Sequence, residues 1–132
     1  MQNLVNMFVS KKEVKYSNPV LEKSFEFGVR IVRFYLYLGK KNKNIQSLLK
    51  QILRSGTSIG ANITEAQSAV TKKDFINKLG IALKESKETD YWLRLLKKSE
   101  IIEEKEFNSI NQDCLEIIKL LTSIIKSSKT KI

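Results

Sequence analysis

A set of cations around one tyrosine is the part of this sequence best suited to binding a ligand. The residues are Lys84, Lys87, Tyr91, Arg94 and Lys98, which we call the basic row. At 100° per residue their side chains fall on one stripe of a helix, and Lys73 lies near the upstream continuation of that stripe. Cations beside an aromatic ring suit a phosphate backbone with an occasional stacked base. A plain solvated lysine face has the same pattern.

The overall charge also favours an anionic partner. The chain has 24 Lys and Arg residues against 14 Asp and Glu, a net charge of +10. Arg30 and Arg33 would extend the basic surface if they lie on the same side. The alternative is a soluble protein from a lysine-rich proteome.

The usual catalytic residues are missing. The chain has no histidine, which removes the commonest general base and the Ser–His and Cys–His nucleophiles. Its single cysteine, Cys114, lies on an apolar stripe and is expected to be inert packing. Residues 56–60 are too short for a phosphate-binding loop and lack its Gly-Lys-Ser/Thr ending. We expect no enzyme activity, no cofactor and no metal, since the di-metal bundles use Glu-x-x-His pairs.

Two other strips have the composition of covered helix surfaces. The first, within residues 51–69, has small or uncharged side chains where a solvated helix would carry charges. The second stands beside the apolar row of residues 73–96, where a buried tryptophan would need another subunit to cover it. Gly56 and Gly60 permit close helix approach, so packing inside one bundle is the alternative. The expected interface or structural residues are Arg54, Ser55, Ser58, Asn62, Glu65, Ile81, Glu85, Glu88 and Trp92.

Long helices are needed to position these residues. The chain of 132 residues is sized for one domain, and one proline and five glycines leave few breaks. The apolar spacing predicts an all-α, antiparallel up-and-down four-helix bundle over residues 18–128. The expected elements are a flexible leader over 1–17, helices over about 19–39, 45–70, 72–97 and 104–127, and a frayed tail over 129–132.

Local signals set two of the helix starts and the buried faces. Asn18-Pro19 and Thr71 with Asp74 are typical of helix N-termini. The second helix is expected to bury a row that ends at Val70. Phe27 and Phe34, at the border of the first helix, are weaker candidates for a subunit contact. The expected apolar face of that helix is Phe25, Gly28, Val29, Ile31, Val32, Tyr35 and Leu36.

The sequence has no membrane or export signal. No run approaches the ~18 apolar residues of a membrane span, and the first residues lack the layout of a cleavable signal. A single cysteine suits a reducing compartment. We therefore expect a cytoplasmic protein.

Four segments together carry a family resemblance: residues 23–27, 50–66, 73–76 and 82–93. In order and spacing the chain resembles the bacterial four-helix bundle proteins, also called 23S ribosomal RNA intervening-sequence proteins, over roughly residues 18–128. Ser86 stands where that family often has alanine. The resemblance implies a ring-shaped homopentamer without enzyme activity. A related group, the accessory proteins of diversity-generating retroelements, binds nucleic acid and a reverse transcriptase.

These observations predict a non-enzymatic, oligomeric helical bundle that binds RNA or DNA through the basic row. One alternative is a protein-binding scaffold whose positive charge maintains solubility or meets an acidic partner. Another is an enzyme with a polar pocket around Asn62, Glu65 and Glu85.

Overall fold

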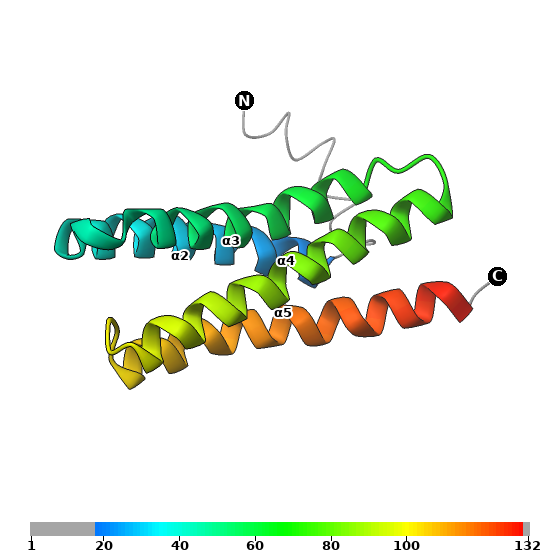
Figure 1. The fold of residues 1–132 in the computed structure, drawn as a ribbon. Coiled ribbons are helices and arrows are strands. Elements are labelled where there is room, and N and C mark those ends of the chain that lie inside the picture. Colours follow the sequence, from blue (N-terminus) through cyan, green and yellow to red (C-terminus); the bar gives the residue numbers. More distant parts are fainter. Residues whose placement is uncertain (1–17, 131–132) are drawn as a thin grey trace, which may run out of the picture.

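The computed structural model describes residues 18–130. The secondary structure in this range consists of helices joined by short connections, with a short 3-10 turn, η1, before the second long helix. The helices are α2 (Pro19–Lys41), α3 (Gln46–Ala66), α4 (Lys72–Lys98) and α5 (Glu104–Thr130), and η1 is Lys43–Ile45 (Figure 1). The expected leader, residues 1–17, lies outside the described residues, as do residues 131 and 132.

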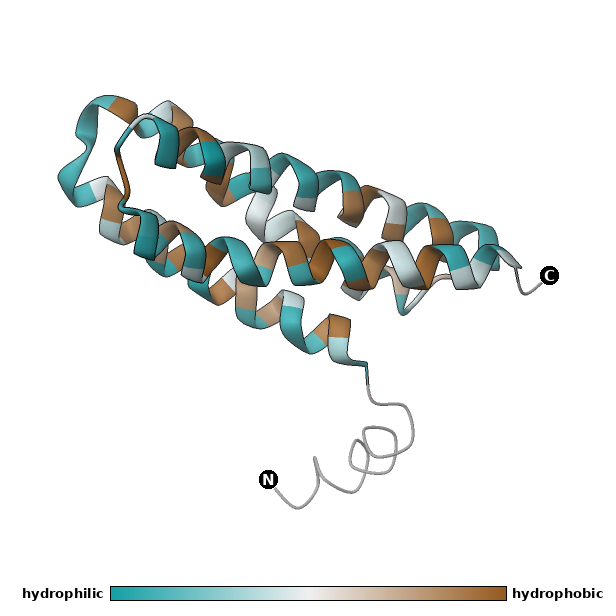
Figure 2. Ribbon diagram, turned by 90° about the horizontal axis from the view of Figure 1, so that it is seen from below, coloured by the Kyte–Doolittle hydropathy of each residue, from teal (hydrophilic) through white to brown (hydrophobic). Residues whose placement is uncertain are grey.

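The helices pack around one core. In the described part of the chain α3 contacts both α2 and α4, and α4 contacts α5. α5 reaches α2 over a smaller contact, whereas no Cα atoms of α2 and α4 approach within 8 Å of each other. Hydrophobic residues recur along every helix (Figure 2). The expected all-α four-helix bundle is therefore confirmed.

Side-chain caps begin three of the helices. At the start of α2 the Asn18 side chain accepts a hydrogen bond from the Leu21 N–H at 3.2 Å. Thr71 does the same for α4, since its Oγ1 lies 3.0 Å from the amide nitrogen of Asp74. At the start of α5 the Glu106 carboxylate accepts a hydrogen bond from the backbone N–H of Glu103 at 3.0 Å. Each cap satisfies an amide that the helix leaves without a partner.

Two helix ends differ from the expected ones by three residues or more. α3 ends at Ala66, four residues before the expected limit, because the next three amides bond to carbonyls three residues back. Val70, expected in the buried row, lies in the connection and is 95% exposed. α5 continues through Thr130, so residues 129 and 130 of the expected frayed tail are helical.

The turn from α4 to α5 is a Schellman motif. Glu100 has a φ of 62°, the left-handed conformation that commonly ends a helix. The Ile101 N–H donates to the Leu96 carbonyl at 2.9 Å, and the Glu100 N–H to the Lys97 carbonyl at 3.0 Å. This turn brings the start of α5 beside the last turns of α4.

The buried face of α2 is not the one that the sequence pattern favours. α2 carries two apolar rows, and only one can face the core. The buried residues are Val20, Ser24, Phe27, Ile31 and Leu38. The expected face included Ile31 correctly, but it also included Phe25, Val32 and Leu36, which are exposed. Phe27, a weak interface candidate, lies in the core, and Phe34 packs partly buried against it.

Close contact between α2 and α3 selects this rotation. A Cβ on Gly56 would lie 2.8 Å from Cγ1 of Ile31, a fully buried side chain. A Cβ on Gly60 would lie 3.2 Å from the Ser24 carbonyl oxygen. The two glycines therefore admit α2 of the same protomer, which supports the interpretation of packing inside one bundle.

Replacement of Gly56 by alanine should distinguish the effect of close packing on stability from the effect of helix propensity. We expect Gly56→Ala to lower the free energy of unfolding by about 1–3 kcal/mol, because the buried Ile31 side chain must shift. Gly80→Ala is the matched control: nothing lies within 4 Å of its Cβ position, so it should stabilise α4 by about 0.5–1 kcal/mol. Urea unfolding measures both, and equal effects of the two variants would argue against the close contact.

Candidate functional site

The basic row lies on the outer face of α4. The inner face of α4 buries Leu79, Ala82, Leu93 and Leu96 in the core. Because the row is on the opposite side of the helix, all five of its side chains are exposed. Lys73 is exposed in the first turn of the same helix.

Most of these cations have no acidic partner. Within residues 18–130, no ion pair involves Lys84, Lys87, Lys98 or Lys73. Arg94 pairs with Asp90 on the preceding turn at 3.1 Å; the arginine side chain is 60% exposed and that of Asp90 19%, and such pairs within one helix stabilise little. The row is thus a set of solvated charges available to an anion.

The two arginines of α2 do not join this row. Arg30 is used within the protomer: it pairs with Asp113 at 2.6 Å and donates to the Ser109 hydroxyl at 2.9 Å. Arg33 lines a shallow groove between α2 and α5 together with Lys105. Both arginines therefore face α5, and no Cα atom of α2 lies within 8 Å of one in α4, so neither arginine is a neighbour of the basic row.

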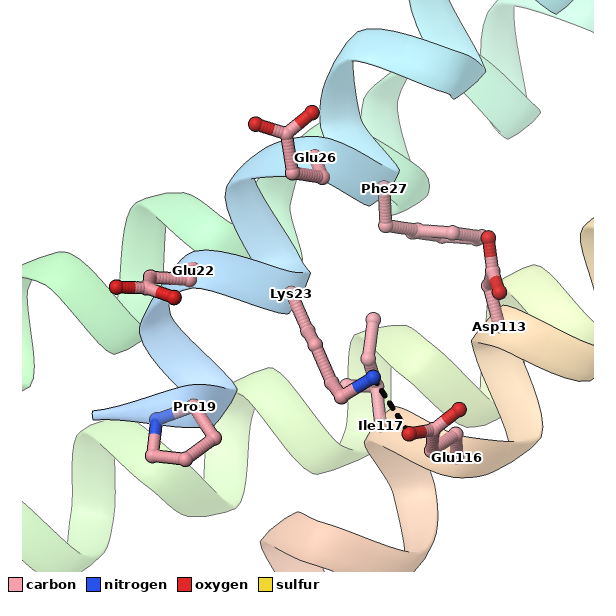
Figure 3. A pocket seen from close by; sticks show the side chains of 8 residues that line it. All are labelled: Pro19, Glu22, Lys23, Glu26, Phe27, Asp113, Glu116 and Ile117. Atoms are coloured by element: carbon pink, nitrogen blue, oxygen red, sulfur yellow. Dashed lines mark ion pairs between the residues drawn. The ribbon is translucent and has the colours of Figure 1, made fainter. Parts of the chain in front are cut away.

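Charged side chains close the boundary between α2 and α5. Figure 3 shows Lys23 and Glu116 pointing toward one another across these helices, at 2.6 Å, beside Phe27 and Ile117. The Glu116 carboxylate raises the pKa of Lys23, chiefly through this hydrogen bond. This pair and that of Arg30 support the smallest helix–helix contact of the bundle.

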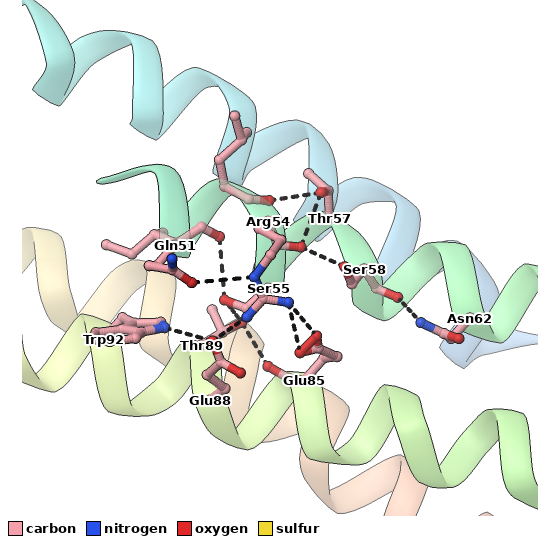
Figure 4. Close-up of polar contacts among 12 residues, drawn as sticks. Gln51, Arg54, Ser55, Thr57, Ser58, Asn62, Glu85, Glu88, Thr89 and Trp92 are labelled. Carbon is pink, nitrogen blue, oxygen red and sulfur yellow. Dashed lines mark hydrogen bonds and ion pairs between the residues drawn. The ribbon is translucent and has the colours of Figure 1, made fainter. Parts of the chain in front are cut away.

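The expected interface strips meet each other inside one protomer. Arg54 of α3 donates to both oxygens of Glu85 on α4, at 2.8 and 3.2 Å, and pairs with Glu88. The Trp92 indole N–H donates to the same Glu88 carboxylate at 3.0 Å. Figure 4 shows these side chains bridging the two helices. We call Arg54, Glu85, Glu88 and Trp92 the polar cluster. Trp92 is partly buried by its own protomer, so its position requires no second subunit.

The remaining strip residues also have partners in the protomer. Ser55 is fully buried and accepts a hydrogen bond from Thr89 at 2.9 Å. Asn62 donates to the Ser58 carbonyl at 2.8 Å, and Glu65 pairs with Lys78 at 3.0 Å. Each polar group named for a catalytic pocket is therefore engaged with a different partner. Ile81 alone among the strip residues is a large exposed hydrophobic side chain.

The electrostatics of the polar cluster fix its charges. The hydrogen bond from Trp92, and then the one from Arg54, lower the pKa of Glu88. Glu85 and Glu88 together raise the pKa of Arg54. Arg54 of α3 is thus bound by two carboxylates of α4, and Trp92 by one of them, and these contacts hold α3 to α4.

Nucleophilic and metal chemistry find no support in the described residues. Burial raises the pKa of the Cys114 thiol to about 12, so it is almost entirely protonated at neutral pH. Among residues 18–130, no three His, Cys, Asp or Glu side chains are arranged to hold a metal ion. Over the same range, every helix is too short or too polar to cross a bilayer.

The structure reveals a surface that the sequence pattern assigned to the core. We call it the apolar face; it is a groove lined by Phe25, Gly28, Val29, Val32, Thr57, Gly60, Ala61 and Thr64 of α2 and α3. Phe25 is 68% exposed there, and Leu36 extends the same side of α2 one turn further. The signal in the sequence was the second apolar row of α2, which a single core cannot bury.

Comparison with known proteins gives the family. Residues 17–123 match the family described as 23S rRNA-intervening sequence protein. The chain belongs to this family. A crystal structure of a protein of unknown function from the S23 ribosomal protein family of Bacteroides thetaiotaomicron VPI-5482 is 58% identical, with a TM-score of 0.79. The similarity covers 81% of this chain and 98% of that one. A comparison with curated proteins finds no match.

Acid should weaken the polar cluster. Because the folded-state pKa of Glu88 is lowered, its contribution is complete above its unfolded value near 4.5 and is lost as pH falls through the folded value. We expect Glu88→Gln to destabilise the fold by about 1 kcal/mol at pH 7 and by less as the pH falls below 4.5. Urea unfolding of the wild type and the variant, at pH 7 and at a pH below 4.5, measures the loss in free energy of unfolding at each pH. The exposed Glu26→Gln variant is the control, and an equal response from it would contradict the assignment.

Proposed function

We propose that this family member is a non-enzymatic, oligomeric protein that binds RNA or DNA through the basic row. The observation that carries the proposal is the outer face of α4, where Lys84, Lys87 and Lys98 are exposed and have no ion pair within residues 18–130. At 1.5 Å per residue this row is about 21 Å long, a span of roughly six phosphates on one strand of a duplex. The lysines would neutralise phosphates while Tyr91 packs or stacks.

We further propose an antiparallel, up-and-down order for the four helices. It is supported by contacts between α2 and α3 that pair early residues of one with late residues of the other. Gly60 meets Ser24, Gly56 meets Ile31, and Gly39 meets Gln46. Figure 1 also draws the α3–α4 connection at the opposite end from the other two connections.

The proposed oligomer is a ring-shaped homopentamer, with the apolar face in the contact between copies. Its support is physical: exposed apolar surface is unfavourable in water by about 25 cal/mol per Å², and a second copy would remove that surface from solvent. The pentamer is the assembly that the resemblance implies. A ring would place several basic rows within reach of one polymer, which multiplies a weak contact through effective concentration.

A charge in the apolar face should dissociate the assembly. We expect light scattering on a sizing column to report a species several times 15.2 kDa, and Val32→Glu to shift it toward the protomer. Val32 is 42% exposed in the apolar face. Ile81→Glu is the matched control, since Ile81 is 44% exposed on α4, in the strip first expected at the interface. If Ile81→Glu dissociates the assembly and Val32→Glu does not, the contact between copies lies on α4. If the wild-type protein is a monomer, the proposed contact does not exist.

Binding to nucleic acid should depend steeply on salt. We expect the logarithm of affinity to fall linearly with the logarithm of salt concentration, because bound lysines release counterions. Lys84→Ala with Lys87→Ala should weaken binding and reduce the slope by about 1 for each lysine that contacts phosphate. Fluorescence anisotropy with labelled RNA and DNA measures both quantities.

The matched control removes the same charge elsewhere. Lys119 and Lys126 are exposed on α5 and have no ion pair within the described range. Lys119→Ala with Lys126→Ala should leave the slope nearly unchanged. If the two double variants change the slope equally, binding depends on overall positive charge and not on the basic row. If wild type does not bind at low salt, the proposed function is wrong.

A protein-binding scaffold remains the second candidate, favoured by the apolar face itself. Such a face fits a partner helix as well as another copy. Recovery of one specific protein despite nuclease treatment, by wild type but not by Val32→Glu, would favour this function over nucleic-acid binding.

A further inference from the structure

A second feature lies at one end of the basic row, where α4 turns into α5. It is an open groove of about 940 Å³, within the size range of ligand sites. We call it the aromatic groove; it is lined by Tyr91, Arg94, Leu95, Lys97, Lys98, Glu100 and Phe107. The Schellman turn at Glu100 forms it by bringing the first turn of α5 beside the last turns of α4.

Two aromatic rings from different helices line this groove. Tyr91 is 49% exposed, and its ring packs on that of Trp92 in a T-shaped arrangement, with a centroid distance of 5.0 Å and an interplanar angle of 69°. That contact holds the tyrosine ring in place while half of its surface stays open. Phe107 is partly buried against the core. A fixed, half-exposed ring is the element on which a flat ligand stacks at low entropic cost.

Three cations surround these rings. Lys97 Nζ lies 4.8 Å from the centroid of the Phe107 ring, and the Arg94 guanidinium carbon lies 6.0 Å from that of Tyr91. Lys97 also pairs with Glu104 at 3.4 Å, an exposed pair that a phosphate would replace at little cost. Lys98 has no ion pair within residues 18–130. The groove therefore combines stacking surface with positive charge.

We propose that the aromatic groove binds an unstacked nucleobase of single-stranded RNA or DNA, with the base on Tyr91 and the flanking phosphates on Lys98 and Arg94. This inference rests on the proposed function and narrows its substrate class. A single strand is required because both faces of a base in a duplex are already stacked. The remainder of the basic row then follows the backbone away from the groove.

The test compares bases with backbone alone. Oligodeoxythymidine and an abasic oligonucleotide of equal length carry the same charge, so electrostatics alone would bind them equally. At one fixed salt concentration we expect wild type to prefer the thymidine strand by about tenfold. Binding of the thymidine strand, and not of the abasic strand, should also change the fluorescence of Trp92, which contacts Tyr91.

Variants assign the preference to the groove. Tyr91→Ala should abolish it, whereas Tyr91→Phe should keep it because the phenyl ring still stacks. Lys84→Ala with Lys87→Ala should weaken binding of both strands and leave their ratio unchanged. Circular dichroism of Tyr91→Ala, an exposed site, checks that the helices are intact.

The outcomes separate the two proposals. Equal wild-type affinity for both strands, with a normal salt slope, overturns the base-binding groove and leaves the proposed function standing. A preference that survives in Tyr91→Ala also overturns it. Absence of binding to either strand, with a duplex still bound, overturns the groove alone, and absence of binding to both strands and to a duplex at low salt overturns both proposals.

Discussion

The contact between Ile31 and Gly56 is the constraint on which the rest of this bundle depends. Because Gly56 has no Cβ, Ile31 of α2 reaches the backbone of α3 and is fully buried there. That approach fixes the rotation of α2 about its axis and turns Phe27 into the core. The same rotation leaves the second apolar row of α2, with Phe25 and Val32, outside. The apolar face is thus a direct consequence of the way in which the core is packed.

Local signals in the sequence predicted the features that depend on one helix alone. Four helices, the caps at Asn18 and Thr71, and the placement of the basic row on one stripe follow from spacing and residue type within a helix. The buried face of α2 was not predictable in this way, since its two apolar rows are equally periodic. The choice between them rests on Gly56, which lies 25 positions after Ile31 in the sequence. The early end of α3 has a similar origin, because turn hydrogen bonds and the cap at Thr71 outweigh one more apolar residue.

The partners of charged residues were equally hidden from the sequence. Arg30 and Arg54 have the same chemistry as the arginine of the basic row, but each lies opposite a carboxylate on a neighbouring helix. Each arginine also makes a second contact across the same boundary, Arg30 with Ser109 and Arg54 with Glu88, so both are engaged between helices in a way that the arginine of the basic row is not. Several residues of the strips expected to be interface or structural also pair within the protomer, as Arg54 does with Glu85 and Glu88. Helix–helix register decides these pairings, and periodicity within one helix carries no information about it.

The cations behind the net charge of +10 are of two kinds, those paired with carboxylates and those exposed to solvent. Cations at the helix boundaries are neutralised by carboxylates within the protomer, whereas those on the outer face of α4 are exposed to solvent. A uniform basic surface would attract any polyanion weakly. A narrow row with an exposed tyrosine among its cations can instead follow one strand and contact its bases. Because the apolar face lies on α2 and α3, association through it would leave the outer face of α4 uncovered by that contact. In the proposed assembly, contacts between copies and ligand binding would use separate surfaces, so each added copy would add a basic row without blocking another.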